Sequence, residues 1–290
     1  MNQLNIFIEL TRLNKPIGFM LLFWPCSWGL VLSYGHNQDF KTTIYYLILF
    51  FLGSVLMRSA GCIVNDIVDK DLDKKIKRTK NRPLASKKIT VKKSLFYVIV
   101  ICLLAFLILI QFNKLTIFLG MFSMFFAFSY PYMKRITYWP QLFLGLTFNW
   151  GVIMAWTSIN NFISLEIVIL YLAAIFWTLG YDTIYGTQDI VDDEIIGIKS
   201  TSIKFKADIK NFVSLCYFIS AVLISYIIFS KMHILLPSIF MFIFFINLFY
   251  QVKIFSVKNP KKSLIAFKSN NIGGLLLFCA ILLTSKNLYL

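Results

Sequence analysis

The sequence predicts an all-α polytopic membrane protein, a single bundle of about nine transmembrane helices with cytoplasmic cap loops. Hydrophobic residues make up 58% of the 290 residues and charged residues only 14%, with a mean hydropathy of +0.73. A soluble domain would carry about a quarter charged residues. The apolar residues form long continuous runs, which excludes the alternating pattern of barrel strands. Lys and Arg gather between alternate runs, as they do around helices that cross a bilayer.

Nine apolar runs are near the length that an α-helix needs to cross the hydrocarbon core. The first follows a short lead-in of residues 1–16. It is too long for a cleaved signal peptide and lacks a small-residue cleavage pattern, so we expect a retained helix kinked at Pro25. The predicted helices cover residues 17–34, 43–64, 94–112, 115–130, 141–158, 163–185, 211–230, 233–252 and 271–287.

In chain order, the predicted helices cross the bilayer back and forth. The second run leads into a basic loop at about 65–93, and the third and fourth runs form a hairpin that turns at residues 113–114. The fourth run ends in Lys134-Arg135, and the sixth leads into a polar loop at about 186–210. With nine crossings, these loops and the N-terminus lie on one side of the membrane.

The Lys and Arg residues are distributed very unevenly over the two sides. The segments on the N-terminal side hold 24 of the 29, and Arg58 lies inside the second run. This asymmetry places the N-terminal side in the cytoplasm. The net charge of +16 therefore reflects membrane topology, and we expect no nucleic-acid partner. The four cations on the other side are Lys41, Lys114, Lys231 and Lys286.

The remaining composition points to one domain without a cysteine-based site. The five cysteines are scattered singly through apolar runs, with no metal-ligand spacing and no evident disulfide pair, and His36 and His233 receive no role. We expect a single transmembrane domain over residues 1–290. The spacing of two acidic segments suggests two four-helix halves within it, about 17–130 and 141–252, followed by a ninth helix.

The first acidic segment runs from Asp66 to Asp73, where the second predicted helix meets the basic loop. If that helix continues through the segment, Asn65 and Asp69 share the face of Arg58, and Asp66 and Asp73 lie within about 80° of it. The helix would then present a row of oxygen ligands on one side. An arginine inside an apolar run is costly unless it has a partner or a ligand, so Arg58 belongs to the same candidate site.

The second acidic segment begins at Asp182 and ends at Glu194, so that the two segments hold nine of the 13 acidic residues. On a continuous sixth helix, Asp182, Asp189 and Asp193 align within about 20°, with Asp192 about 80° away. Crowded carboxylates repel one another, and hard oxygen ligands suit Mg²⁺. The sequence therefore predicts Mg²⁺ as the cofactor. The alternative is a solvated acidic loop paired with its own lysines.

Two acidic rows and nearby cations at a membrane edge predict a Mg²⁺–diphosphate site. Arg and Lys grip phosphate oxygens. A site embedded in lipid favours a long isoprenoid diphosphate, with its head at the cytoplasmic face and its tail in the bilayer. Mg²⁺ would stabilise the departing diphosphate, and aromatic walls would shield the resulting allylic cation from water. The chain holds 30 Phe, 14 Tyr and six Trp residues.

These motifs make the chain similar to the UbiA superfamily of intramembrane aromatic prenyltransferases, over nearly its whole length. The first is Asn65-Asp66-x-x-Asp69-x-x-x-Asp73, followed by a KRTxNRPL stretch at 77–84. The second is the YDxxYxxxDxxDDxxIGIKST stretch at 181–201. The N-terminal RLNKPIG at 12–18 most resembles the group that prenylates 4-hydroxybenzoate in ubiquinone biosynthesis. Asn14 and Gly186 depart mildly from that pattern, where Asp and Ala are usual.

The resemblance implies C-prenylation of 4-hydroxybenzoate by a polyprenyl diphosphate at the inner membrane of a bacterium, with the site facing the cytoplasm. It implies that Arg135 holds the carboxylate of the acid, with Lys134 as an alternative, and that Asp182 orients the phenol or takes the ring proton. The expected diphosphate contacts are Asn65, Arg78, Arg82 and Lys199, and Arg58 is expected to contact the diphosphate or a carboxylate, with a structural pairing to Asp69 as the alternative. The expected metal ligands are Asp66, Asp69, Asp73, Asp189, Asp192 and Asp193.

Other functions remain open from the sequence. The same fold could prenylate homogentisate, dihydroxynaphthoate, a haem or a chlorophyllide. A divalent-cation transporter would need acidic residues at mid-membrane and broken helices there, whereas both acidic segments emerge on one side. A membrane scaffold without catalysis would leave the spaced aspartates unexplained.

Overall fold

The computed structural model describes residues 2–37, 39–230 and 235–285 of the chain. The described part is all-helical, as predicted, with nine helices long and apolar enough to cross a membrane. The long helices are α2 (Ile17–Asn37), α3 (Phe40–Val68), α5 (Val91–Leu109), α6 (Lys114–Ile136), α7 (Pro140–Asn160), α8 (Leu165–Gly186), α11 (Ile209–Phe229), α12 (Leu235–Ile254) and α13 (Pro260–Ser285). The short ones are α1 (Gln3–Thr11), α4 (Lys70–Asp73), α9 (Ile190–Ile196) and α10 (Thr201–Lys204).

Each predicted run corresponds to one long helix. Residues 233–234 and 286–287 of the eighth and ninth runs lie outside the described residues, as does His233. Pro25 lies inside the unbroken helix α2. Helix α13 begins at Pro260, well before the predicted start at 271, because its first turns carry lysines that hydropathy excludes from a membrane run. Helix α1 lies in the lead-in, where no element was predicted.

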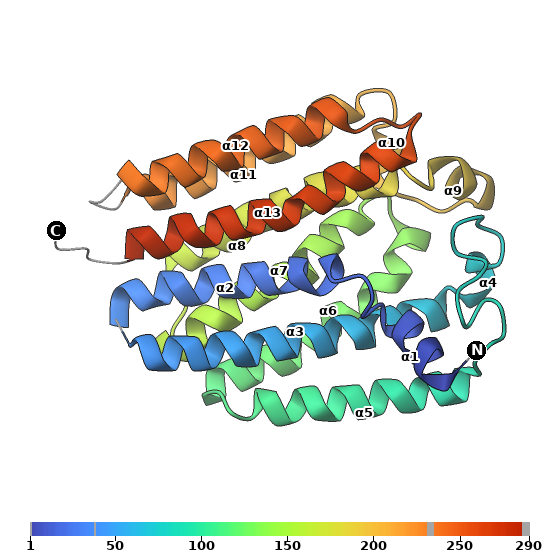
Figure 1. Ribbon diagram of the computed structural model, residues 1–290, viewed down its shortest axis with the longest axis horizontal. Helices are drawn as coiled ribbons and strands as arrows, with labels where there is room; N and C mark the ends of the chain where they lie inside the picture. Colours follow the sequence, from blue (N-terminus) through green and yellow to red (C-terminus); the bar gives the residue numbers. More distant parts are fainter. Residues whose placement is uncertain (1, 38, 231–234, 286–290) are drawn as a thin grey trace.

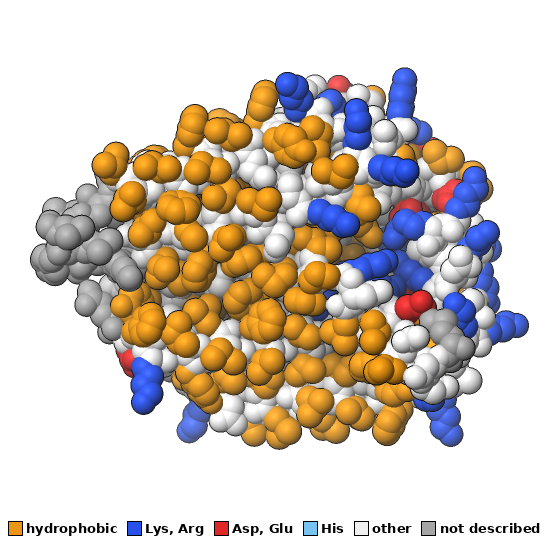
Figure 2. All heavy atoms as spheres, viewed as in Figure 1, with side chains coloured by type: hydrophobic (Ala, Val, Ile, Leu, Met, Phe, Trp, Pro, Cys, Tyr) orange, Lys and Arg blue, Asp and Glu red, His pale blue; other side chains and the backbone are white. Residues whose placement is uncertain are grey.

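The long helices run side by side along the longest dimension of the molecule (Figure 1). Helices α1, α4, α9 and α10 gather at one end, and α13 ends at the other. Lys and Arg side chains crowd the end with the short helices, and apolar side chains cover the belt between the ends (Figure 2). The protein is therefore an integral membrane protein, and the cation-rich end fits the predicted cytoplasmic side.

Local sequence signals set the helix starts. Four long helices begin after a side chain that accepts a hydrogen bond from the backbone N–H three residues later, which satisfies an otherwise free helix donor. These N-cap residues are Asp39, Thr90, Asn113 and Ser164. Helices α7 and α13 begin at Pro140 and Pro260, where the missing N–H of proline costs nothing.

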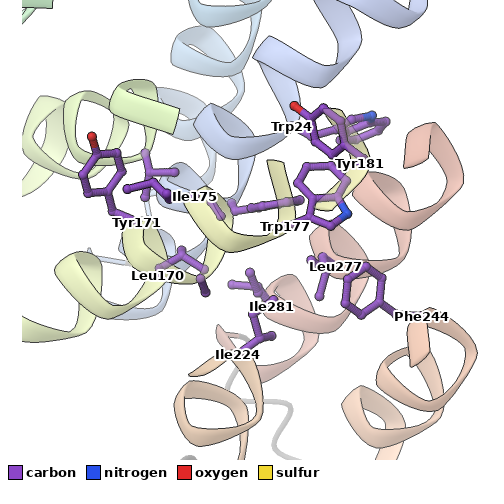
Figure 3. Packing of buried hydrophobic residues seen from close by; sticks show 14 of the residues in the cluster. Trp24, Leu170, Tyr171, Ile175, Trp177, Tyr181, Ile224, Phe244, Leu277 and Ile281 are labelled. Atoms are coloured by element: carbon purple, nitrogen blue, oxygen red, sulfur yellow. The ribbon is translucent and has the colours of Figure 1, made fainter. Parts of the chain in front are cut away.

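The core is built around α8, the most buried of the long helices. Trp28, Trp156 and Trp177 are fully buried there, and Figure 3 shows Trp177 and Tyr181 of α8 packed among side chains of neighbouring helices. Helices α2 and α7 approach closely at Gly29, where an added Cβ would collide with the carbonyl oxygen of Val152. In lipid, such close approach supplies the packing that holds helices together.

Helices α2 and α13 are joined along a tight seam. The Trp24 indole N–H donates to Asn271 Oδ1 at 2.9 Å, and the Trp28 indole N–H donates to the carbonyl of Gly274 at 3.0 Å. An added Cβ at Gly274 would collide with the Trp24 ring. The two tryptophans therefore close the space between α2 and α13.

Candidate active site

The first acidic segment spans a break between two helices. Helix α3 ends at Val68, Asp69 has φ −96° and ψ 3°, and α4 follows. The condition for the predicted alignment, a helix that continues through the segment, is not met, because the chain turns at Asp69. The turn still keeps a four-residue repeat of backbone bonds, from Asp69 N–H to Asn65 O and from Asp73 N–H to Asp69 O. Asp66, Asp69 and Asp73 are consequently all buried.

The second acidic segment is also broken. Helix α8 ends at Gly186 and α9 begins at Ile190, so Asp182 does not share a helix with Asp189 and Asp193, contrary to the prediction. Gly186 leaves room for the hydroxyl group of Ser202, because an added Cβ at residue 186 would collide with Ser202 Oγ. Asp182 therefore lies deeper in the bundle, and Asp189 directly precedes the short helix α9 at the cation-rich end.

The basic loop after α4 bridges the two acidic segments. The Arg78 guanidinium donates from Nε to Asp189 Oδ1 at 2.8 Å and from Nη1 to the Tyr185 hydroxyl at 3.1 Å. The backbone N–H of Lys77 donates to Asp192 Oδ2 at 3.0 Å. Residues more than 100 positions apart thus meet over one end of the bundle, as the sequence predicts for the two segments.

Two arginines hold the buried carboxylates of the first segment. Arg12 Nη2 lies 2.6 Å from Asp66 Oδ1, and Arg82 Nη1 lies 3.1 Å from the same oxygen. Arg82 also pairs with Asp73 at 2.9 Å. Sequence reasoning predicted Arg82 as a diphosphate contact but gave Arg12 no role. The sequence signal that could have identified Arg12 is its position in the RLNKPIG stretch. In the structure Arg12 lies in a turn and has a φ of 57°.

The two cations at the end of α6 occupy different environments. Lys134 pairs with Asp69 and lines the cavity described below. Arg135 donates to the carbonyl of Val68 at 2.7 Å, its side chain is 45% exposed, and it is not among the cavity-lining residues. Arg135 Nη2 also lies 3.6 Å from Asp69 Oδ1. Arg135 therefore contacts the end of α3 from outside the cavity lining. Lys199 donates to the carbonyl of Ile136 at 3.1 Å and lines the cavity.

A cavity of about 1410 Å³ opens beneath the acidic segments and extends deep into the bundle. Asp66 and Asp192, both predicted metal ligands, are not among the residues that line it. Asp66 lies fully buried behind Arg12 and Arg82. The predicted site residues that do line the cavity are Arg58, Asn65, Asp69, Asp73, Arg78, Arg82, Lys134, Asp182, Asp189, Asp193 and Lys199.

Arg58 and Asp182 form the deepest charged part of this lining. Arg58 Nε is buried and has no hydrogen-bond partner among the described residues. Its guanidinium lies 5.2 Å from the centroid of the Phe148 ring, and an added Cβ at Gly18 would lie 2.8 Å from Nε. A buried donor without a partner is costly, so this guanidinium is available to an anionic ligand in the cavity.

The donor set of the acidic segments suits a hard divalent cation. Asp66 Oδ2 and Asp69 Oδ1 are buried without a hydrogen-bond partner in the described part of the chain. Burial, together with the nearby Asp189 carboxylate, raises the pKa of Asp193 to about 7, and a cation would remove that repulsion. Within the described residues, no three His, Cys, Asp or Glu side chains converge on one point. Most of these carboxylates instead form ion pairs with arginines and lysines of the protein.

The fold and the site together define a class of protein. It is an integral membrane protein with a deep, largely apolar cavity, and the cation-rich end of this cavity carries two aspartate segments. Such an end suits a diphosphate with a divalent cation, and the apolar interior suits a hydrocarbon chain. The model of the UbiA prenyltransferase family matches residues 22–279, and the chain belongs to this family.

Individual relatives agree with this assignment. The chain is 39% identical to the 4-hydroxybenzoate octaprenyltransferase of Blochmanniella pennsylvanica, over 94% of this chain and 93% of that one. It is 44% identical to a mitochondrial 4-hydroxybenzoate polyprenyltransferase of Caenorhabditis elegans, over 73% of this chain and 59% of that protein. The chain thus spans about half to three-fifths of the length of several mitochondrial relatives.

Solved structures show the same fold at low identity. The apo structure of a UbiA homolog from Aeropyrum pernix K1 matches with a TM-score of 0.77 and 20% identity, over 91% of this chain and 97% of that one. A UbiA homolog from Archaeoglobus fulgidus, bound to GPP and Mg²⁺, matches with a TM-score of 0.71 and 16% identity, over 96% and 99%.

Proposed function

We propose that this protein transfers a polyprenyl group from a polyprenyl diphosphate to 4-hydroxybenzoate, at the ring carbon ortho to the hydroxyl, in ubiquinone biosynthesis. The observation that carries the proposal is that the two aspartate segments line the same cavity within the helix bundle, where Arg78 of the basic loop contacts Asp189. The names of the relatives support the acceptor, and the homolog bound to GPP and Mg²⁺ supports the donor and the metal.

The diphosphate and Mg²⁺ belong at the cytoplasmic end of the cavity. Asp69 and Asp73 on one side, and Asp189 and Asp193 on the other, supply carboxylates that line it. When bound, Mg²⁺ would neutralise the negative charge that develops on the leaving diphosphate. Asp66 and Asp192 do not line the cavity and would support the site through their contacts with Arg12 and with the Lys77 backbone. Asn65, Arg78, Arg82, Lys134 and Lys199 also reach the cavity wall and would contact the phosphate oxygens.

Arg58 is the residue we assign to the carboxylate of the acceptor. Its buried Nε lacks a partner among the described residues, and its guanidinium lies over the Phe148 ring. The guanidinium N–H groups could therefore bind a carboxylate in a bidentate manner. Arg135, the residue that the resemblance favours for this role, is half exposed and bonded to a backbone carbonyl. Asp182 lines the same cavity, and we assign it to the phenol hydroxyl.

The transfer breaks the allylic carbon–oxygen bond of the donor and forms a carbon–carbon bond to the ring. The electron pair of the broken bond leaves with the diphosphate, and the ring carbon supplies the pair for the new bond. The ring then loses one proton, which Asp182 would accept. The apolar walls of the cavity exclude the water that would otherwise capture the allylic cation.

We infer that the protein lies in the cytoplasmic (inner) membrane of a bacterium, with its site facing the cytoplasm. The bacterial relative that matches over 93% of its length and the gathering of cations at the site's end support this placement.

The proposal is tested with purified protein, Mg²⁺, a radiolabelled polyprenyl diphosphate and a panel of acceptors. Prenylated 4-hydroxybenzoate should form, with little product from homogentisate or dihydroxynaphthoate. If product formed only with another acceptor, prenyl transfer would be supported, but 4-hydroxybenzoate would be rejected as the acceptor. No product from any acceptor would reject prenyl transfer.

A further inference from the structure

The segment that follows α9 returns to the bundle along the cavity wall. Ile198, Lys199 and Ser200 line the cavity, and α10 begins at Thr201. Lys199 is the residue of this segment that we assign to the phosphate oxygens of the donor. Helices α9 and α10 are only seven and four residues long and are too short to be stable alone. Contacts with the long helices must therefore fix the position of Lys199.

Gln141, the second residue of α7, makes one of these contacts with its side chain. Its Oε1 accepts a hydrogen bond from the backbone N–H of Thr201 at 2.9 Å. Both residues are buried, and Gln141 also lines the cavity. A buried backbone N–H needs an acceptor. Gln141 supplies that acceptor, and it fixes the chain two residues from Lys199.

The end of α6 holds the same segment at Lys199 itself. The backbone N–H of Lys199 donates to the carbonyl of Lys134 at 2.9 Å, and the Lys199 ammonium donates to the carbonyl of Ile136 at 3.1 Å. An ammonium group has three N–H donors, so two remain for a phosphate oxygen. The segment is thus held at two successive points, by α6 at Lys199 and by α7 at Thr201.

We propose that Gln141 is a positioning residue for the donor: it holds the backbone at Thr201 and thereby keeps the Lys199 ammonium at the diphosphate end of the cavity. This inference rests on the proposed function, which supplies the diphosphate. The end of α8 leaves room for the link, since an added Cβ at Gly186 would lie 3.4 Å from Gln141 Nε2. Gln141 acts through Lys199 and carries no charge of its own.

The test measures Mg²⁺-dependent binding of a non-reactive thiodiphosphate analogue of the donor by calorimetry. Gln141→Met keeps the approximate size of the side chain but removes the acceptor oxygen. We expect it to weaken binding about two- to tenfold, the scale of one hydrogen bond. Lys199→Met should weaken binding at least as much, because it removes a charged donor. In the Lys199→Met background, Gln141→Met should then cost less than about twofold, since residues that act through one another are not additive.

Initial rates give a second readout that general damage would not move. Gln141→Met should raise the KM for the polyprenyl diphosphate and leave the KM for 4-hydroxybenzoate within about twofold. Gln141→Asn, whose side chain is one methylene shorter, should show the same donor-selective loss if Gln141→Met does not fold.

Asn149→Leu is the matched control. It removes a buried link between α7 and α8, in which Asn149 Nδ2 donates to Thr178 Oγ1 at 2.8 Å, and neither residue is among those that line the cavity. Like Gln141→Met, it should lower the melting temperature in detergent, because each variant removes a buried hydrogen bond. Unlike Gln141→Met, it should leave the KM for the donor unchanged.

Several results would overturn the role of Gln141. Unchanged binding of the analogue to Gln141→Met would do so, as would equal rises of both KM values in that variant. Additive losses with Lys199→Met would show that Gln141 does not act through Lys199. A rise of the donor KM in Asn149→Leu as large as in Gln141→Met would indicate general damage to α7. No binding of the analogue by the unaltered protein would instead reject the proposed function itself.

Discussion

Replacing Arg58 with Met should weaken the acceptor without weakening the donor. Methionine keeps an unbranched apolar stem, although a shorter one, and lacks the guanidinium whose Nε is buried without a partner among the described residues. A hydrogen bond between charged groups contributes about 1.5–3 kcal/mol. At about 1.36 kcal/mol per factor of ten, the KM for 4-hydroxybenzoate should rise about 10- to 150-fold. The KM for the polyprenyl diphosphate should stay within about twofold.

Two controls make this result specific. Phenol lacks the carboxylate, so the unaltered protein should discriminate against it, and Arg58→Met should lose most of that discrimination. Arg135→Leu removes the other arginine considered for this role and should leave the acceptor KM unchanged, since Arg135 contacts the carbonyl of Val68 and the Asp69 carboxylate and does not line the cavity. The assay is the initial rate over a range of acceptor concentrations at saturating donor. If Arg135→Leu raises the acceptor KM and Arg58→Met does not, the assignment is refuted.

Three further outcomes follow from the site and the core. Asp189→Asn should lower the rate about 10²- to 10³-fold, the scale of losing a group that stabilises developing charge; a rate within threefold of the unaltered protein, about 0.7 kcal/mol, would argue against the metal assignment. Removal of divalent cations with EDTA should abolish transfer, and added Mg²⁺ should restore it; transfer that persists in EDTA would contradict a metal role. Gly29→Ala should lower the melting temperature in detergent, because its Cβ meets the carbonyl oxygen of Val152, at a cost of about 1–3 kcal/mol. Gly61→Ala, with nothing within 4 Å of its Cβ, should not lower it.

The positions of the nine long helices were predictable because a bilayer demands long apolar runs and a backbone bonded within each segment. The side of the acidic segments was predictable for the same reason, since counting crossings fixes which loops share a side. Helix α1 was not predictable by this route. It packs Phe7 edge-on against Tyr97 of α5, and such a contact between distant residues leaves no periodic signal in nine residues.

The candidate site was predictable in composition but not in shape. The aspartate spacings matched a helix, yet both helices break, at Asp69 and after Gly186, where tertiary packing overrides the local period. The partners of the carboxylates also depend on the loops: Arg12 reaches Asp66 from a turn 54 residues earlier in the chain. Arg135 and Lys134 are adjacent in sequence, and only the orientation of α6 shows which one reaches the cavity.

The most direct test of the central claim asks whether the two acidic segments bind one diphosphate together. Mg²⁺-dependent binding of a non-reactive thiodiphosphate analogue of the donor would be measured by calorimetry for Asp69→Asn, Asp189→Asn and the double variant. Groups that act on one ligand are not additive. We therefore predict that the double variant binds little more weakly than either single variant. Losses of binding free energy that simply add would show that the segments act independently and would contradict the account.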